Sequence, residues 1–271
     1  STEVVRFLRQ FIVLRIKKRR PIAQTVGFFV ILVRNDKENT MADVRLYISR
    51  HGKTMFNTIG RVQGWCDTPL TKKGEEGIRE LGLGLKDTGV DFKLAVSSDL
   101  GRTVQTMTIA LRELERLGQI PYYQDKRIRE WCFGSFEGMY DAELFQGVLP
   151  RLKGTVDTNG MSFAEIATGI QEADTAGWSE SWEVLSNRIL TGFESIAQDL
   201  EKQGGGNALV VSHGMTIATL AHLLDPERGA DVVLDNGSIT VLKYENSSFT
   251  IESFGDMSYR QRGAELIAQG K

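Results

Sequence analysis

The stretch that decides the fold of this chain is VRLYISRHG, residues 44–52. A short apolar run ends there in Arg50-His51-Gly52, and a second apolar run, residues 208–214, ends alike in His213-Gly214. Ligands bind at the carboxyl ends of the strands in open α/β sheets. A glycine directly after each histidine lets the backbone turn sharply and come close to a ligand. The chain has three histidines. Two of them at equivalent strand ends predict a site there and leave His222 as a bystander.

Strand and helix signals alternate along the chain from residue 44 onward, which predicts an α/β layer architecture. Thr71 is a typical cap for a helix that runs to about residue 86. A second helix is predicted to reach about Leu117, with Gly118 in the position of a C-terminal cap. The fold class that we predict is an α/β three-layer sandwich, with a mostly parallel central sheet flanked by helices and a helical lid insertion. The other predicted strands are 92–97, one near residue 122, 208–212, and a closing hairpin of 238–244 and 249–254 around 246–247; the other predicted helical regions are 141–203, clearest over 182–202, and 215–224.

The 271 residues have the composition of an ordinary globular protein, with 41% hydrophobic and 25% charged residues. The net charge of −2 divides unevenly, because residues 1–40 carry nine Lys/Arg and three Asp/Glu and the remainder is net −8. Nucleic-acid binding requires a basic face, so an acidic body predicts no nucleic-acid partner. We expect two parts, a basic extension over 1–40 and one domain over 41–271.

The basic extension contains two apolar stretches, 11–14 and 26–33, which are too short for the roughly 18 apolar residues of a membrane span. We interpret residues 1–40 as an upstream extension that is not part of the fold, with Met41 as the functional start. The alternative is an amphipathic, Arg-rich anchor that contacts a membrane surface.

The two cysteines, Cys66 and Cys132, lack the number and spacing of a disulfide scaffold or a zinc site. A reducing compartment is the simplest interpretation, so we expect a cytoplasmic protein. The acids nearest the histidine motifs, Asp67, Asp99 and Glu130, do not form a magnesium-binding cluster, and glycines 204–206 lack the Lys-Ser/Thr of a P-loop. We therefore expect neither a metal nor another cofactor.

The octet at residues 50–57 follows the pattern Arg-His-Gly-x-Thr/Ser-x-x-Asn. With this octet the chain resembles the histidine phosphatase superfamily, the group that includes the cofactor-dependent phosphoglycerate mutases. Further matches follow in the family's order and extend the resemblance from about Val44 to Tyr244. They lie at residues 67–74, 97–106, 129–138, 212–214 and 236–238.

The resemblance implies a role for each motif residue. His51 is the nucleophile that takes up the phosphoryl group, and imidazole suits this role because its ordinary pKa of about 6.5 leaves a large neutral fraction in the cell. Arg50 and Arg102 bind the phosphate, for which the planar guanidinium fork is well shaped. His213 donates to a phosphate oxygen, as an imidazolium, and Glu130 protonates the leaving oxygen. Further predicted contacts to the substrate come from Thr54, Asn57, Gln63, Gly64 and Gly214.

Each of these residues has a plainer interpretation when it is taken alone. Either arginine would then be a solvated surface residue, and Glu130 would be an exposed loop acid. Glu137 matches the family's Phe/Trp-Glu-Gly element, where we expect a structural role. Cys132 lies close to the proton donor but has no task in this chemistry, so we interpret it as a packing residue.

The residues that cover the site decide between a phosphatase and a mutase. The predicted lid, about 139–180, contains only the cations Arg151 and Lys153. The octet has Thr54 and Phe56, where mutases of this family usually show Ser and Trp. Both departures favour a phosphomonoester hydrolase that acts on a small phosphorylated metabolite, and the alternatives are a phosphoglycerate mutase and a noncatalytic phosphate- or phosphoprotein-binding module. The apolar lid residues are interpreted either as a surface for a moderately apolar substrate or as helix-packing core: Met139, Tyr140, Leu144, Phe145 and Trp178.

Overall fold

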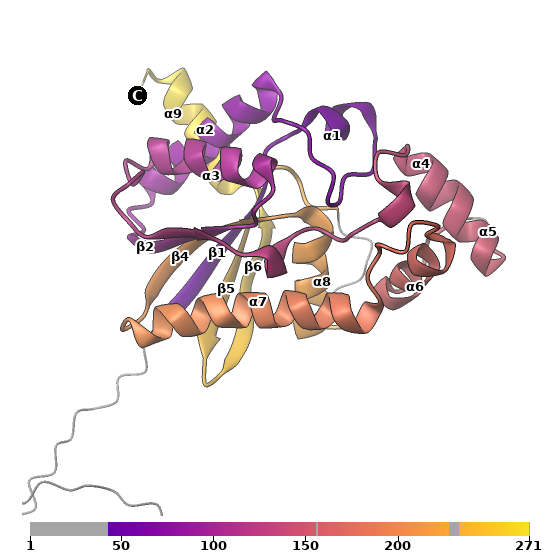
Figure 1. Cartoon of the computed structure of the whole chain (residues 1–271). Coiled ribbons are helices and arrows are strands. Elements are labelled where there is room, and N and C mark those ends of the chain that lie inside the picture. The colour runs from indigo at the N-terminus through magenta and orange to yellow at the C-terminus, as the bar shows by residue number, and fades with distance from the viewer. Residues whose placement is uncertain (1–42, 156, 228–232, 271) are drawn as a thin grey trace, which may run out of the picture. The chain divides into compact units, whose positions relative to one another are not determined.

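The computed structural model describes residues 43–155, 157–227 and 233–270. The expectations for residues 1–40 lie outside this part of the chain. The predicted α/β fold with a mostly parallel sheet flanked by helices is confirmed (Figure 1). In the described ranges no helix is both long enough and apolar enough to cross a membrane.

A six-stranded sheet with the order β3-β2-β4-β1-β5-β6 forms the centre of the molecule. β3, β2, β4 and β1 are parallel, and β5 and β6 form an antiparallel hairpin at one edge. The predicted turn of this hairpin is confirmed, with Asn246 and Ser247 both in the left-handed region at φ 53° and 59°, as a two-residue hairpin turn requires. The strand bounds are β1 Val44–Arg50, β2 Phe92–Ser97, β3 Tyr122–Gln124, β4 Gly206–Ser212, β5 Ile239–Glu245 and β6 Ser248–Asp256.

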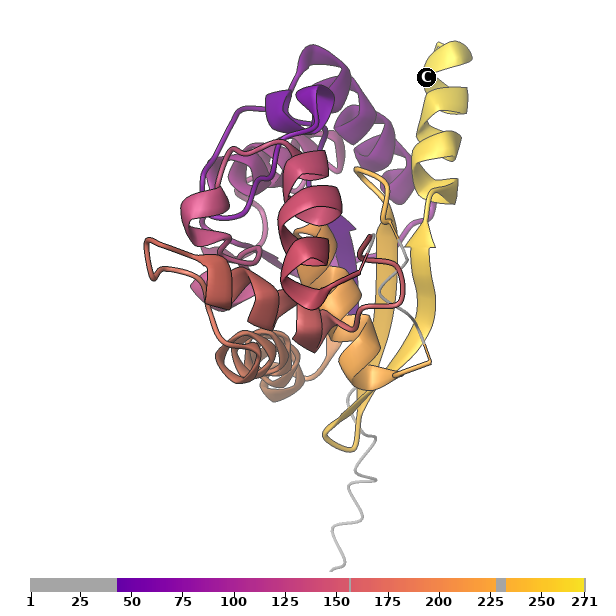
Figure 2. The same ribbon diagram turned by 90° about the vertical axis from the view of Figure 1, so that its right-hand side faces the viewer.

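Helices cover both faces of the sheet, as Figures 1 and 2 show. α2 (Lys72–Asp87), α3 (Gly101–Glu113) and α9 (Ser258–Ala268) lie on one face, and α7 (Trp182–Lys202) and α8 (Gly214–Leu224) lie on the other. The smaller helices α4 (Asp141–Glu143), α5 (Leu149–Lys153) and α6 (Phe163–Ala173), with the π-helical turn η3 (Leu144–Val148), lie beyond the carboxyl ends of the strands. The remaining elements are α1 (Met55–Ile59) and the 3₁₀ turns η1 (Lys126–Ile128) and η2 (Gly134–Phe136).

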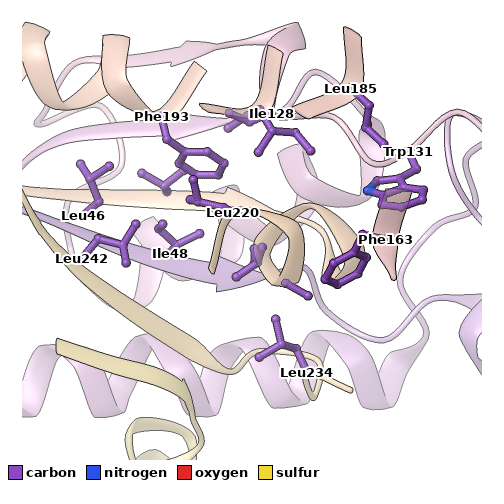
Figure 3. Packing of buried hydrophobic residues seen from close by; sticks show 14 of the residues in the cluster. Leu46, Ile48, Ile128, Trp131, Phe163, Leu185, Phe193, Leu220, Leu234 and Leu242 are labelled. Atoms are coloured by element: carbon purple, nitrogen blue, oxygen red, sulfur yellow. The ribbon is translucent and has the colours of Figure 1, made fainter. Parts of the chain in front are cut away.

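The core strands are buried on both faces because alternate residues pack against opposite helix layers. Leu46 and Ile48 of β1 face the α7/α8 side together with Phe193 (Figure 3), and all three are 0% exposed. Leu209 and Val211 of β4 face the opposite cluster, under α2 and α3. Each fully buried aliphatic side chain of this kind contributes about 1.5–3 kcal/mol.

Of the two helices whose caps were predicted, the first agrees with the structure and the second ends earlier than expected. Thr71 caps α2 as expected, because its hydroxyl accepts the backbone N–H of Gly74 at 3.0 Å. α3, however, ends at Glu113 and not near Leu117. The chain leaves the helix there because Glu115 adopts a left-handed conformation, with φ 56°, four residues after Leu111. Gly118, also left-handed, lies in the turn that follows and does not cap the helix.

Candidate active site

The two histidines lie side by side because β1 and β4 are parallel neighbours. Arg50 pairs with Ser212 in the register of these strands, so His51 and His213 leave the sheet at the same level. Their ring centroids are 5.3 Å apart, and the residues are 3% and 0% exposed. The structure thus brings together the two predicted strand ends.

The hydrogen bonds of His51 determine its tautomer. Its Nδ1 lies 2.9 Å from the carbonyl oxygen of Gly52. A carbonyl oxygen only accepts, so Nδ1 carries the proton and Nε2 carries the lone pair. Burial, together with the charges of Arg102 and Arg50, holds the pKa of His51 well below its usual range. The ring is therefore neutral at physiological pH, with Nε2 available as a nucleophile.

A chain of hydroxyl groups determines the tautomer of His213. The Thr103 hydroxyl donates its single proton to backbone carbonyl oxygens, of which the nearest, that of Leu100, is 2.7 Å away. Ser98 Oγ therefore donates to Thr103 Oγ1, at 2.7 Å. The remaining contact, 2.7 Å between Ser98 Oγ and His213 Nε2, then needs a proton from the ring. In the neutral ring Nδ1 accordingly carries a lone pair.

The imidazolium form that we expected for His213 is not favoured by the protein groups alone. Burial, followed by the charge of Arg102, holds the pKa of His213 well below its usual range. A bound phosphate dianion would act in the opposite direction, because an opposite charge close to a group favours its charged form.

The Arg102 side chain is 0% exposed and is bound almost completely by its own protein. Nη1 donates to the Cys66 carbonyl at 3.1 Å and to the Asp67 carboxylate at 2.9 Å. Nη2 donates to the carbonyls of Gly64 at 2.7 Å and Gln63 at 3.4 Å. Nη1 and Nη2 of Arg102 therefore cannot both bind one phosphate in this arrangement, contrary to the expectation from the sequence. Nε is the atom of the guanidinium that remains for a ligand.

Three buried nitrogen atoms of the predicted site residues have no hydrogen-bond partner within the described part of the chain. They are Arg50 Nε, Arg102 Nε and His213 Nδ1. Buried polar groups are almost always paired, and three exceptions around one nucleophile indicate a place where an external group completes the hydrogen bonding. Arg50 lies against the residue after His213, because a Cβ on Gly214 would be 3.2 Å from Arg50 Nε. Two guanidinium groups make that external group an anion.

Glu130 is held beside the second histidine and is not an exposed loop acid, since it is 6% exposed. Its Oε1 accepts from the Thr216 backbone N–H at 2.9 Å and the Trp131 N–H at 3.0 Å. It also lies 3.0 Å from the Thr216 hydroxyl, which is nearer, at 2.8 Å, to the Arg129 carbonyl oxygen. Its Oε2 accepts from the Met215 N–H at 3.1 Å. Met215 and Thr216 lie in the first turn of α8, directly after His213-Gly214, so α8 fixes the carboxylate relative to His213.

The predicted contacts Thr54, Asn57 and Gln63 are bound mainly to one another. The Thr54 hydroxyl donates to Gln63 Oε1 at 2.7 Å and accepts from the Asn57 N–H at 3.1 Å, which caps α1. Gln63 Nε2 in turn donates to Thr68 at 2.9 Å. These bonds hold the loop after His51, and in this arrangement the Thr54 hydroxyl proton is not directed at a substrate. Asn236, on the loop before β5, completes the network by donating to the His51 carbonyl at 2.9 Å and to Asn57 Oδ1 at 3.3 Å.

Gly64 has room only for a hydrogen atom. A Cβ at this position would lie 2.1 Å from the carbonyl oxygen of Trp131. Glu137 fixes the same loop, because its carboxylate accepts the backbone N–H groups of Gly64, Trp65 and Cys66 at 3.0, 2.7 and 3.1 Å. The structural role expected for Glu137 agrees with these bonds, since the loop that it holds provides the carbonyls that bind Arg102.

Three residues of the site have no role assigned from the sequence. They are Ser98, which orients His213, Asp67, which pairs with Arg102, and Asn236, which binds the His51 carbonyl. All three lie in motifs that the resemblance covers, so their sequence position could have marked them as site residues. The groups that they bind could not be predicted from the sequence.

Burial raises the pKa of Cys66 to about 12 and also raises that of Cys132, which fits packing residues. In the described ranges no group of three or more His, Cys, Asp or Glu could hold a metal ion.

The segment at 139–180 places few cations near the site. Lys153 pairs with Glu172 at 3.6 Å, and Arg151, in the middle of α5, is exposed. Among the apolar residues of the segment, Leu144 is fully buried and Met139 and Phe145 pack against the core. Two others remain at the surface: Tyr140, under the guanidinium of Arg61 at 4.1 Å, and Trp178, which is 71% exposed.

Comparisons with known proteins agree with this fold. The family model described as the histidine phosphatase superfamily (branch 1) matches residues 46–257. A probable phosphoglycerate mutase, GpmB, of Salmonella paratyphi B is 30% identical over 224 residues, which are 80% of this chain and 94% of that protein. The crystal structure of a phosphoglycerate mutase from Bacillus anthracis has a TM-score of 0.79 and 38% identity, and covers 84% of this chain and 100% of its own. The structure of an alpha-ribazole phosphatase from Shigella flexneri has a TM-score of 0.59 over 79% of this chain and 96% of its own; at 24% identity it shows the fold alone.

The sheet order and the two histidine strand ends define an α/β protein of the histidine phosphatase type. With the family model covering most of the domain, the chain belongs to the histidine phosphatase superfamily, branch 1.

Proposed function

We propose that the protein is a phosphomonoester hydrolase that acts on a small phosphorylated metabolite through a phosphohistidine at His51. The observation that supports this most strongly is the set of three buried nitrogens without a protein partner, Arg50 Nε, Arg102 Nε and His213 Nδ1, beside a neutral His51. A phosphoryl group in transfer carries negative charge on its peripheral oxygens, and catalysis consists mainly of positioning it and stabilising that charge.

In the first step His51 Nε2 attacks phosphorus, so that an N–P bond forms and the bond from phosphorus to the leaving oxygen breaks. Glu130 donates a proton to that oxygen. Its Oε2 suits the donor role, because within the described residues it accepts one backbone N–H and Oε1 accepts two. In the second step water attacks phosphorus, Glu130 takes a proton from the water, and inorganic phosphate leaves as the N–P bond breaks.

The scarcity of cations on the segment 139–180 supports hydrolysis. A mutase must hold a bisphosphorylated intermediate while it reorients, which requires positive charge on the residues that cover the site. Lys153 is paired with Glu172, and Arg61, which contacts Tyr140, also donates to the Gly138 carbonyl. We take this segment as the lid, and its composition supports entry of water to the phosphoenzyme.

Phosphoglycerate mutase is the second candidate. The names of the relatives from Salmonella and Bacillus anthracis favour it. A noncatalytic binding module is the candidate of another class, and the presence of His51 and Glu130 in bonded positions counts against it.

The experiment that tests the proposal is a turnover screen across phosphorylated metabolites, with and without a bisphosphoglycerate primer and with and without EDTA. We expect phosphate release that EDTA does not change and that vanadate blocks, because vanadate mimics the five-coordinate phosphorus of the transition state. Interconversion of 3-phosphoglycerate and 2-phosphoglycerate that is faster than phosphate release would establish the mutase instead. Absence of both reactions, with phosphate esters still bound, would favour the binding module.

A further inference from the structure

Arg188, in the second turn of α7, makes an unusual set of contacts with the loop that carries Glu130. Its Nη1 donates to the carbonyl oxygens of Arg127 at 3.0 Å and Arg129 at 2.9 Å. Its Nη2 donates to the carbonyl oxygen of Glu130 itself at 2.9 Å. One guanidinium therefore binds three carbonyls within four consecutive residues and ends on the proposed proton donor.

A carboxylate fixes the guanidinium from the opposite side. Glu180 Oε1 and Oε2 accept from Arg188 Nε and Nη2, both at 2.5 Å, and the two side chains are only 13% and 12% exposed. A bidentate pair of this kind holds the plane of the guanidinium as well as its position. Glu180 terminates the segment 139–180, so this pair also joins that segment to the loop of Glu130.

The Glu130 carbonyl has a second donor, Trp65 Nε1 at 3.0 Å. Trp65 lies in the loop whose carbonyls bind Arg102, and the Arg129 guanidinium stacks on its ring at 4.7 Å. Arg188 and Trp65 thus both bind the carbonyl oxygen of Glu130, and backbone N–H groups of α8 bind its carboxylate. In the described part of the chain, Arg188 donates hydrogen bonds to these three carbonyls and to Glu180.

We propose that Arg188, held by Glu180, is a positioning residue that places the Glu130 carboxyl group for proton transfer to the leaving oxygen. The proposal rests on the proposed function, because it presupposes that Glu130 is the proton donor. Lysine cannot replace the arginine, because an ammonium group lacks the planar fork that spans three carbonyls and a carboxylate. A displacement of about 1 Å at a reacting group is enough to reduce a rate by about 100-fold.

The test compares two substrates in Arg188→Lys and in the double variant Glu180→Gln/Arg188→Gln. The double variant removes both charges, so that no buried charge is left without its partner. An alkyl phosphate needs protonation of its leaving oxygen, whereas p-nitrophenyl phosphate does not. We expect kcat/KM for the alkyl phosphate to fall about 10- to 100-fold and that for p-nitrophenyl phosphate to fall less than about 3-fold. Arg116→Lys is the matched control, since Arg116 forms an exposed ion pair with Asp91, and both substrates should be unaffected there.

Glu130→Gln, measured in parallel, separates failure of this proposal from failure of the proposed function. If Glu130→Gln shows no difference between the two substrates, the proposed function is wrong in its proton donor. If Glu130→Gln shows the difference but both Arg188 variants lose equal activity on the two substrates, Arg188 supports only the fold and the positioning role is overturned. Equal losses with a large fall in Tm would lead to the same conclusion.

Discussion

Binding of a phosphate-like anion should bring one additional proton to the site, and that proton should reside on His213 Nδ1. The chain from Thr103 through Ser98 leaves a lone pair on Nδ1 of the neutral ring. A dianion that approaches this nitrogen presents lone pairs of its own, so the contact becomes a hydrogen bond only when the proton is present. Burial and Arg102 keep the pKa of His213 well below its usual range before binding.

The direction of the pH dependence follows from this uptake. Binding raises the pKa of His213, so affinity for an anion that does not itself titrate is highest at low pH and is lost as the pH rises. Uptake of one proton corresponds to about a tenfold loss of affinity, or ~1.4 kcal/mol, for each pH unit between the two pKa values of His213.

Isothermal titration calorimetry with sulfate or tungstate, in buffers of different ionisation enthalpy, measures the number of protons directly. The wild-type protein should take up close to one proton at neutral pH. His213→Asn should take up none, because an amide donates without being protonated, whereas His51→Asn should behave like the wild type. Uptake near zero in the wild type, or uptake that is lost with His51 and kept without His213, would refute the assignment of the tautomer.

Other substitutions separate the roles of the site residues. Glu130→Gln should slow hydrolysis of alkyl phosphates by about 100-fold or more with a much smaller effect on p-nitrophenyl phosphate, and equal losses in steady-state assays would count against its role as the acid. Arg102→Ala should slow both substrates alike, by about 100- to 1000-fold, because it removes charge stabilisation from any ester; a loss confined to poor leaving groups would contradict this. Gly64→Ala should lower the free energy of unfolding by about 1–3 kcal/mol through the clash with the Trp131 carbonyl, and should also reduce turnover. Gly147→Ala is the control for both measurements, because the atom nearest to a Cβ there is 4.0 Å away. An unchanged Tm in Gly64→Ala would show that the loop moves to accommodate the methyl group.

Local patterns predicted much of the fold. The apolar run 92–97 corresponds to β2, because a strand that is buried on both faces is apolar at nearly every position. The helical periodicity of 182–202 corresponds to α7, because a helix that is buried along one stripe has apolar residues about every three to four positions. The end of α3 was wrong because a left-handed Glu115 stops the helix, and a residue with no special preference for that conformation gives no signal. α9, which packs on α2, was missed for a related reason, since its short apolar face shows only weak periodicity.

The identity of the site residues could be predicted, but their use of hydrogen bonds could not. Motif spacing selected Arg102, yet the carbonyls that occupy its fork belong to residues 36–39 positions earlier in the chain. Arg188 is 58 residues from the carbonyl of Glu130 that it binds, and a lone arginine in a helix looks like a surface residue. Both cases depend on tertiary contacts that no local pattern records.

Transfer of a phosphoryl group to His51 is the central claim, and trapping the intermediate tests it most directly. The protein is mixed with a radiolabelled phosphate ester, quenched rapidly at alkaline pH, where phosphohistidine survives, and digested for peptide mapping. We predict label on the peptide that contains His51, with phosphorus on Nε2, because Nδ1 is bound to the Gly52 carbonyl. Label on Cys132 or on a serine, or a His51→Ala protein that keeps most of its activity, would contradict the account.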